Sequence, residues 1–193
     1  MASEQEASIA LHLQAGELGE AATAAILAYG SQVLGYLAAV LRSEADAAEA
    51  FSAFAERLWR GIRGFRGQSS FRTWVYRVAW SAAQDVVRDP FRRRGRRLQT
   101  VEAAGIPAPA LSAPEPWQRA SSPDALERLR ARLRPEEQTL LALRVGRGFS
   151  WREVAQVLAA PGVAPPSEAA LRKRFEWLKG KLRRMAQEEG LLG

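Results

Sequence analysis

Residues 65–80 read FRGQSSFRTWVYRVAW and hold three arginines and five aromatic residues but no carboxylate. Glycines at 61, 64 and 67 interrupt the chain before most of these rings, and Ser69 or Ser70 is a suitable N-cap residue. The stretch therefore predicts a helix over 71–88. At 100° per residue, the expected core face of this helix consists of Phe71, Trp74, Val75, Val78 and Ala82.

The same projection predicts an aromatic and basic surface on the opposite side of this helix. Trp80 falls at about 180° from Phe71, and its expected neighbours are Thr73, Tyr76, Arg77 and Gln84. Such rings can pack against another helix, contact a protein partner, or stack on unpaired bases while arginines hold phosphates. Six arginines and no acid occur over residues 57–77, and this excess favours nucleic acid.

Charge is divided unevenly along the 193 residues. Residues 1–56 contain eight acids and one base, a balance of −7, so the rest of the chain must carry +14 to reach the total of +7. A polyanion is the expected partner of the basic part. There is no cysteine, and the single histidine, His12, has no partner cluster. We therefore expect no metal, no cofactor and no enzymatic activity.

An uncharged run over residues 21–41 is long enough to span a bilayer. It is rich in alanine and is broken by Gly30, Ser31, Gln32 and Gly35. We interpret it as a buried helix with a face of small residues, and we expect neither a membrane span nor a secretory signal.

The chain as a whole predicts an all-α protein with two small helical domains joined by a proline-rich linker. Residues 1–90 form the expected first domain, with helices near 21–42, 46–60 and 71–88. Arginines crowd residues 88–97, and five prolines follow before residue 124. This composition predicts a basic, extended linker over 91–123. Residues 124–193 form the expected second domain, and no β-alternation of useful length occurs.

The second domain carries several helix-start signals. Leucines at 126, 129 and 133 have helical spacing after a start at Pro123 and Asp124. Pro135 begins the next expected helix, and Ser150 caps a further one that runs to Leu158. Ser167 caps the last helix, which ends near residue 188. This succession predicts a helix-turn-helix, with a turn of unusual length at AAPGVAPP.

The last helix combines an apolar stripe with a basic surface. The stripe consists of Leu171, Phe175, Leu178, Leu182 and Met185. Seven cations lie off the stripe against two acids, which is also the pattern of a merely solvated helix. The last helix begins at Ser167 and follows a helix that begins at Ser150, as in a helix-turn-helix. This arrangement favours DNA binding over a merely solvated helix. We expect Arg172, Lys173 and Glu176 to reach base edges, and Lys179, Lys181 and Arg183 to hold phosphates.

Two long segments resemble a known family. Residues 46–88, DAAEAFSAFAERLWRGIRGFRGQSSFRTWVYRVAWSAAQDVVR, resemble the promoter-melting domain of bacterial extracytoplasmic-function (ECF) sigma factors. LRPEEQTLLALRVGRGFSWREVAQVL and SEAALRKRFEWLKGKLRRM resemble their C-terminal helix-turn-helix domain. The resemblance implies a cytoplasmic subunit that guides core RNA polymerase to promoters and assists strand opening. It also implies an anti-sigma factor as a partner.

The resemblance also implies site residues. The polymerase clamp would contact Glu49, Ser52, Ala53 and Glu56. Promoter melting and the minus-ten element would involve Phe65, Arg66, Ser69, Ser70, Phe71, Tyr76, Arg77, Trp80, Ser81 and Gln84, in duplex and single-stranded DNA. The minus-thirty-five element would be read by Ser167, Arg172, Lys173, Glu176, Trp177 and Lys179.

Three positions depart from the family pattern. In the run EAFSA over residues 49–53 only Glu49 keeps a charge, Trp80 and Ser81 replace a common Arg-Asn pair, and Trp177 begins a triplet that is commonly Arg-Ala-Arg. The alternative hypothesis is therefore a helix-turn-helix regulator that binds DNA without acting as a polymerase subunit.

Overall fold

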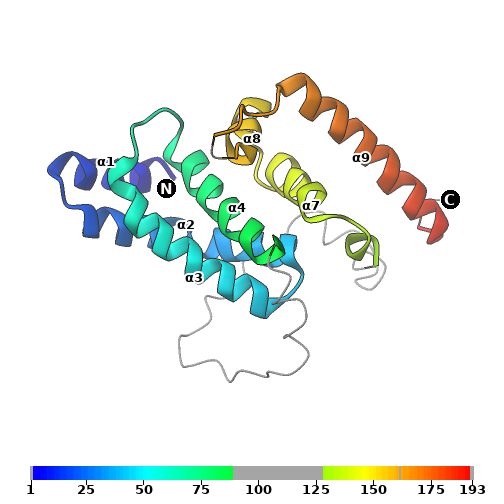
Figure 1. Ribbon diagram of the computed structural model, residues 1–193, viewed down its shortest axis with the longest axis horizontal. Coiled ribbons are helices and arrows are strands. Elements are labelled where there is room, and N and C mark those ends of the chain that lie inside the picture. Colours follow the sequence, from blue (N-terminus) through cyan, green and yellow to red (C-terminus); the bar gives the residue numbers. More distant parts are fainter. Residues whose placement is uncertain (1, 89–127, 161, 192–193) are drawn as a thin grey trace. The chain divides into compact units, whose positions relative to one another are not determined.

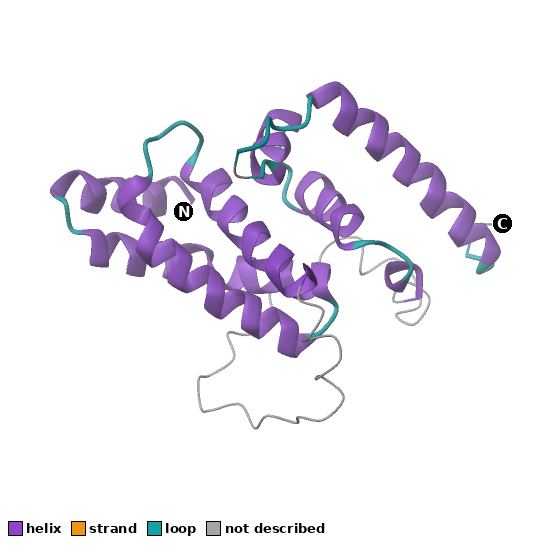
Figure 2. Cartoon of the chain, viewed as in Figure 1, coloured by secondary structure: helices purple, strands orange, loops and turns teal. Residues whose placement is uncertain are grey.

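The structure, a computed structural model, describes residues 2–88, 128–160 and 162–191. Within these ranges the chain forms helices and no strand, so the all-α prediction is confirmed (Figure 2). The protein divides into two compact units, Met1–Ser112 and Ala113–Gly193. The predicted linker over 91–123 and the predicted helix start at Pro123 and Asp124 lie outside the described residues.

The described residues of unit 1, 2–88, form four α-helices and one short 3-10 helix (Figure 1). They are α1 (Ala2–Ala15), α2 (Leu18–Leu41), α3 (Glu44–Gly61), η1 (Ile62–Gly64) and α4 (Phe71–Arg88). The last three α-helices match the predicted ranges within a few residues. The sequence reasoning missed α1, which packs on α2 and is tied to it by the Tyr29 hydroxyl, which donates to Glu6 Oε1 at 2.7 Å.

Short-range signals set the junctions in unit 1. Arg42 ends α2 in the left-handed region, with φ 56°, and its N–H donates to the Ala38 carbonyl. The Ser43 hydroxyl then accepts from the Asp46 N–H at 3.2 Å and caps α3. At the start of α4, the Ser70 hydroxyl accepts from the Thr73 N–H at 3.1 Å. This contact confirms the predicted cap at the second of the two serines.

The core of unit 1 lies where α2, α3 and α4 pack against one another. Tyr36 of α2 meets Tyr76 of α4 edge to face, with ring centroids 5.4 Å apart, and both rings are fully buried. Phe54 and Leu58 of α3 are also completely buried. Together these side chains fill the space between the three helices.

The apolar helix α2 is long enough, by length and composition, to cross a membrane. A core helix of a soluble protein passes the same test, and 44% of the most apolar window is buried inside the fold. Ala21, Val33 and Leu37 are fully covered. The burial agrees with the interpretation of this segment as a core helix.

The prediction that Trp80 and Tyr76 face solvent is wrong. Trp80 is 3% exposed and Tyr76 is fully buried. Thr73, another expected surface residue, is 1% exposed. The reason is that α4 packs against both α2 and α3, so its buried arc covers about 200° of the helix.

The outward face of α4 therefore lies elsewhere. Arg77, Asp85 and Arg88 are exposed, while Ser81 and Gln84 are half-buried. Two residues expected in the core, Trp74 and Val78, are half-buried and project from this outward side of the helix. A projection that assumes one apolar stripe fails for a helix covered on two sides.

Unit 2 contains α7 (Pro135–Leu141), the π-helix η3 (Ala142–Gly146), α8 (Trp151–Leu158) and α9 (Glu168–Glu188), after a helical segment at 128–131. Pro135 occupies the first position of α7, as predicted. The predicted starts of α8 and α9 are also confirmed. In α9 the expected stripe faces inward: Leu171, Leu178 and Met185 are buried, and Phe175 and Leu182 are half-buried.

Candidate nucleic-acid interface

The loop over residues 65–70 is held against the start of α4 by aromatic contacts. The Phe65 ring lies 5.0 Å from Phe71 and 5.5 Å from Trp74, measured between ring centroids. Phe71 in turn lies 6.2 Å from Tyr29 of α2. Phe65 is half-buried and Phe71 is 7% exposed, so both predicted melting residues serve the packing of unit 1.

Polar contacts shape the same loop. Gly67 has φ +68°, a conformation that favours glycine. Ser69 Oγ donates to the Ser70 carbonyl at 3.1 Å, and Ser70 Oγ lies 2.8 Å from Thr73 Oγ1. Ser70 and Arg66 are exposed while Ser69 is half-buried. The loop is thus anchored at its end on α4 and presents its middle to solvent.

The arginine surplus over residues 57–77 is smaller in the structure than in the sequence. Arg57 forms an ion pair with Asp85, which lies beyond the acid-free run, and Arg60 pairs with Glu56 at 2.7 Å. Arg57 Nη1 also donates to Ser81 Oγ at 3.1 Å. Ser81, a predicted minus-ten residue, is therefore already engaged in tying α3 to α4.

Three arginines between residues 57 and 77 remain available on unit 1. Arg63, Arg66 and Arg77 are exposed, and none forms an ion pair or hydrogen bond with another residue in the described ranges. An exposed cation without a protein partner can neutralise phosphate without breaking an existing contact. These three side chains are the candidate phosphate contacts of unit 1, and the sequence reasoning selected two of them, Arg66 and Arg77.

The four predicted clamp residues share one face of α3. Ser52 and Glu56 are exposed, and Glu49 and Ala53 are half-buried. Trp59, three residues beyond Glu56, continues this face and is 54% exposed. The sequence reasoning missed Trp59, although its i+3 spacing from Glu56 was a usable signal.

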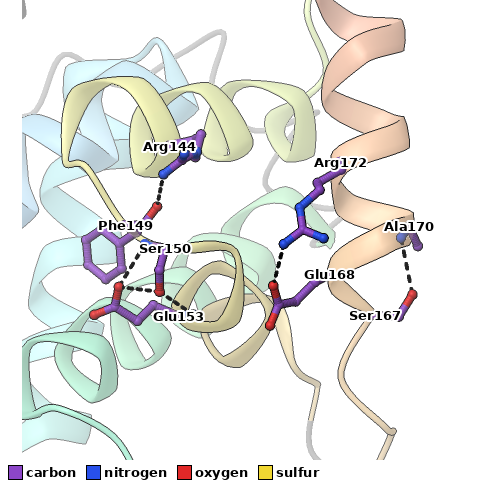
Figure 3. Close-up of polar contacts among 8 residues, drawn as sticks. All are labelled: Arg144, Phe149, Ser150, Glu153, Ser167, Glu168, Ala170 and Arg172. Atoms are coloured by element: carbon purple, nitrogen blue, oxygen red, sulfur yellow. Dashed lines mark hydrogen bonds and ion pairs between the residues drawn. The ribbon is translucent and has the colours of Figure 1, made fainter.

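In unit 2, reciprocal hydrogen bonds fix the start of α8 (Figure 3). The Ser150 hydroxyl accepts from the Glu153 N–H at 3.3 Å, while Glu153 Oε2 accepts from the Ser150 N–H at 2.8 Å. Arg144 of the π-helix donates from Nη1 to the Phe149 carbonyl at 2.8 Å. The backbone entering α8 is therefore held from both sides.

The connection between α8 and α9 ends in the cap of α9. The Ser167 hydroxyl accepts from the Ala170 N–H at 3.2 Å (Figure 3). Ser167 is exposed, but its oxygen already satisfies a backbone donor. The predicted minus-thirty-five residue Ser167 thus has a structural role in starting the helix.

A stack of rings and cations couples α8 to α9. The Arg144 guanidinium lies 4.8 Å from the centroid of the Trp151 ring. Trp151 meets Phe175 of α9 edge to face, with 5.5 Å between centroids, and Lys179 Nζ lies 5.7 Å from the Phe175 ring. Cation–ring and ring–ring contacts of this kind favour one orientation of the two helices.

A largely buried ion pair also fixes α9. Lys181 Nζ lies 2.8 Å from Glu137 Oε2, and the two side chains are 22% and 7% exposed. Burial alone would raise the pKa of Glu137. The hydrogen bonds from Lys181 and the Arg134 N–H, with the nearby positive charges, hold that pKa below its ordinary value. Lys181, expected to hold phosphate, is instead used inside the unit.

Two further cations of α9 are paired along the helix. Arg172 contacts Glu168 at 2.8 Å, and Lys179 contacts Glu176 at 2.8 Å. All four side chains keep large exposed fractions, so these pairs can exchange partners at little cost. The predicted base readers Arg172 and Glu176 are therefore on the surface but not free.

The unpaired cations of α9 form a different set from the predicted one. Four exposed cations of α9 have no ion pair or hydrogen bond with another described residue: Lys173, Arg174, Arg183 and Arg184. Trp177 is 54% exposed, with Lys181 Nζ 5.6 Å from its ring. Of the predicted minus-thirty-five residues, Lys173 and Trp177 are exposed and form no ion pair within the described part of the chain.

Comparisons with known proteins find similarity to sigma factors over most of the chain. Residues 25–96 match sigma-70 region 2, a span that includes most of α2 and all of α3 and α4. The chain is also 26% identical over 171 residues to the RNA polymerase sigma-H factor of Pseudomonas aeruginosa, covering 83% of this chain and 86% of that protein. Residues 25–96 therefore resemble one region of the sigma-70 factors, and most of the chain is similar to one RNA polymerase sigma factor.

Proposed function

We propose that this chain is an ECF-type sigma factor that binds core RNA polymerase, directs it to specific promoters and assists strand opening. The observation that carries the proposal is the extent of the similarity. The match to sigma-70 region 2 covers residues 25–96, and the similarity to the sigma-H factor covers 83% of the chain. The second similarity is too long to lie within unit 1 alone, so it must include part of unit 2. In that unit, α8 and α9 each begin at a serine cap, and α9 is rich in basic residues.

Within this proposal, unit 1 contacts the melted minus-ten strand through its loop and its free arginines. Arg63, Arg66 and Arg77 neutralise phosphates, and the loop over 65–70 receives an unstacked base. Tyr76 and Trp80 support the site from the core, since their rings are buried. The polymerase clamp is proposed to contact the α3 face that includes Ser52 and Glu56.

Unit 2 is proposed to read the minus-thirty-five element with α9. The Ser150 and Ser167 caps, the Trp151–Phe175 contact and the Glu137–Lys181 pair hold the two helices in one arrangement. Lys173 and Trp177 then project from the N-terminal half of α9, where a recognition helix meets base edges. The free cations near its C-terminal end hold phosphates.

The proposal is tested by reconstitution with native core polymerase. The full-length chain should co-elute with core enzyme and yield a transcript with a defined start from a promoter mapped in the source cell. Arg66→Ala combined with Arg77→Ala should lower transcription from a duplex promoter more than from a template that is already open. The matched control is Arg132→Ala, which removes an exposed arginine that pairs with Glu188 at 2.8 Å.

The same assay distinguishes a sigma factor from the alternative, a helix-turn-helix regulator. If the chain binds duplex DNA but neither co-elutes with core polymerase nor supports a transcript, it is a helix-turn-helix regulator and the sigma-factor proposal is wrong. We further propose a cytoplasmic role without chemistry of its own. Metal-dependent cleavage of a labelled oligonucleotide by the purified chain would contradict that statement.

We also propose an inhibitory anti-sigma protein as a partner, because ECF sigma factors are often held inactive by one. Such a protein should compete with core polymerase for unit 1 or unit 2. Affinity purification of the tagged chain from the source cell, in the presence and absence of excess core enzyme, tests this. An anti-sigma partner should be displaced by core polymerase.

A further inference from the structure

Gly180 lies in the middle of α9, where glycine is unfavourable. Glycine loses more backbone freedom on folding than any other residue, and it weakens a helix relative to alanine. Gly180 does not need its special conformational range, since it lies within the regular helix Glu168–Glu188 and has no positive φ. Its presence therefore calls for a reason other than backbone geometry.

Packing within the protein does not supply that reason. At Gly180 an added Cβ would meet one side-chain atom within 4 Å among the described residues outside its own helix backbone, the end of the Arg184 side chain at 3.8 Å, which is ordinary van der Waals contact. A guanidinium on a flexible stem can move aside, so unit 2 itself has room for a side chain here.

The position of Gly180 on the helix points away from the core of unit 2. At 100° per residue it lies about 160° from the buried Leu178. Lys173 and Arg184 lie within about 40° of the same direction, about 10 Å before and about 6 Å after it along the axis. Both are free of ion pairs in the described part of the chain.

We propose that Gly180 is the point where the backbone of α9 makes its closest approach to the sugar-phosphate backbone of duplex DNA. The missing side chain lets the helix surface come up to the strand, and Lys173 and Arg184 contact phosphates on either side of it. Glycine serves close approach to a ligand elsewhere in proteins by the same steric means. The inference rests on the proposed DNA-binding role of unit 2 and adds a specific contact to it.

The test is a size series at one position. Alanine and leucine are both strong helix formers, so Gly180→Ala and Gly180→Leu should each raise the melting temperature of the full chain. The dissociation constant for a duplex promoter fragment should nevertheless increase, several-fold for alanine and at least tenfold for leucine. The loss should be similar on different DNA sequences, because a backbone contact carries no base information.

Fluorescence anisotropy with the full-length chain at low salt measures this directly. Circular dichroism shows whether each variant is folded. If Gly180→Leu is not folded, the comparison of affinities uses Gly180→Ala alone. If the folded variants bind duplex DNA as tightly as the original chain, or if the original chain does not bind duplex DNA, the inference is overturned. If DNA binding depends on side-chain size but core polymerase yields no transcript, the sigma-factor proposal fails and the Gly180 contact stands.

Discussion

The two helices richest in arginine and aromatic residues, α4 and α9, differ in how many sides are covered. Helix α4 is enclosed by α2 and α3, and nine of its residues are buried. Helix α9 is covered along one stripe, and three of its residues are buried. A similar composition therefore has opposite consequences. Rings on α4 hold unit 1 together, whereas Trp177 on α9 remains 54% exposed.

The largest expected effect on stability is in unit 1, where Trp80→Ala would remove a buried ring from the packed side of α4. A buried tryptophan truncated to alanine costs about 3–5 kcal/mol of unfolding free energy. We expect denaturant unfolding monitored by tryptophan fluorescence and circular dichroism to show this loss. A folded, fully stable Trp80→Ala protein that fails only in promoter opening would restore Trp80 as a surface residue and contradict the enclosed packing.

The second effect concerns the pair that fixes the covered side of α9. Glu137→Gln removes the charge facing Lys181, and loss of a charge-assisted hydrogen bond costs roughly 1.5–3 kcal/mol. Because the pKa of Glu137 is lowered in the folded state, its contribution is present above the carboxyl's ordinary pKa. That contribution disappears as the pH falls through the lowered value.

The pH dependence gives a control for this prediction. Denaturation midpoints of the original chain and Glu137→Gln should converge as the pH is lowered into the acid range. Glu136→Gln, which changes an exposed neighbour on the same turn, should follow the original chain. A constant difference between the original chain and Glu137→Gln at every pH would mean that the ion pair is not its source.

A smaller effect is expected at the start of α8. Ser150→Ala removes the hydroxyl that accepts from the Glu153 N–H, and a lost N-cap costs about 1 kcal/mol. Thermal unfolding of the full chain measures the loss. Ser52→Ala is the matched control, since that exposed hydroxyl lies inside α3 and, among the described residues, bonds only to the Ala48 carbonyl at 3.0 Å.

The smallest effect on stability is expected on the open side of α4. Arg77→Ala should change the free energy of unfolding by less than about 0.5 kcal/mol, as exposed substitutions usually do. Binding to a forked or single-stranded DNA should weaken measurably in the same variant. An unchanged affinity for such DNA would remove Arg77 from the proposed phosphate contacts.

The sequence was sufficient where one local signal decided the outcome. Ser150, Ser167 and Pro135 each mark a helix start that needs no distant partner, and the α9 stripe has a single apolar direction. The sequence was insufficient where a residue packs against more than one neighbouring helix. No residue near Trp80 in the sequence indicates that α2 and α3 cover two sides of α4. The partners of Arg57 and Lys181 lie 28 and 44 residues away in the chain.

The ion pairs of α9 also determine how strongly salt should weaken the proposed binding of this helix to DNA. Seven cations lie along the helix, and three of them, Arg172, Lys179 and Lys181, already face carboxylates. Only the other four can release counterions from the duplex without first breaking a protein contact. At about 0.9 ion per neutralised phosphate, their share of the logarithmic salt dependence is limited to a slope of about −3.6. A simple count of lysines and arginines on α9 would give nearly twice that value.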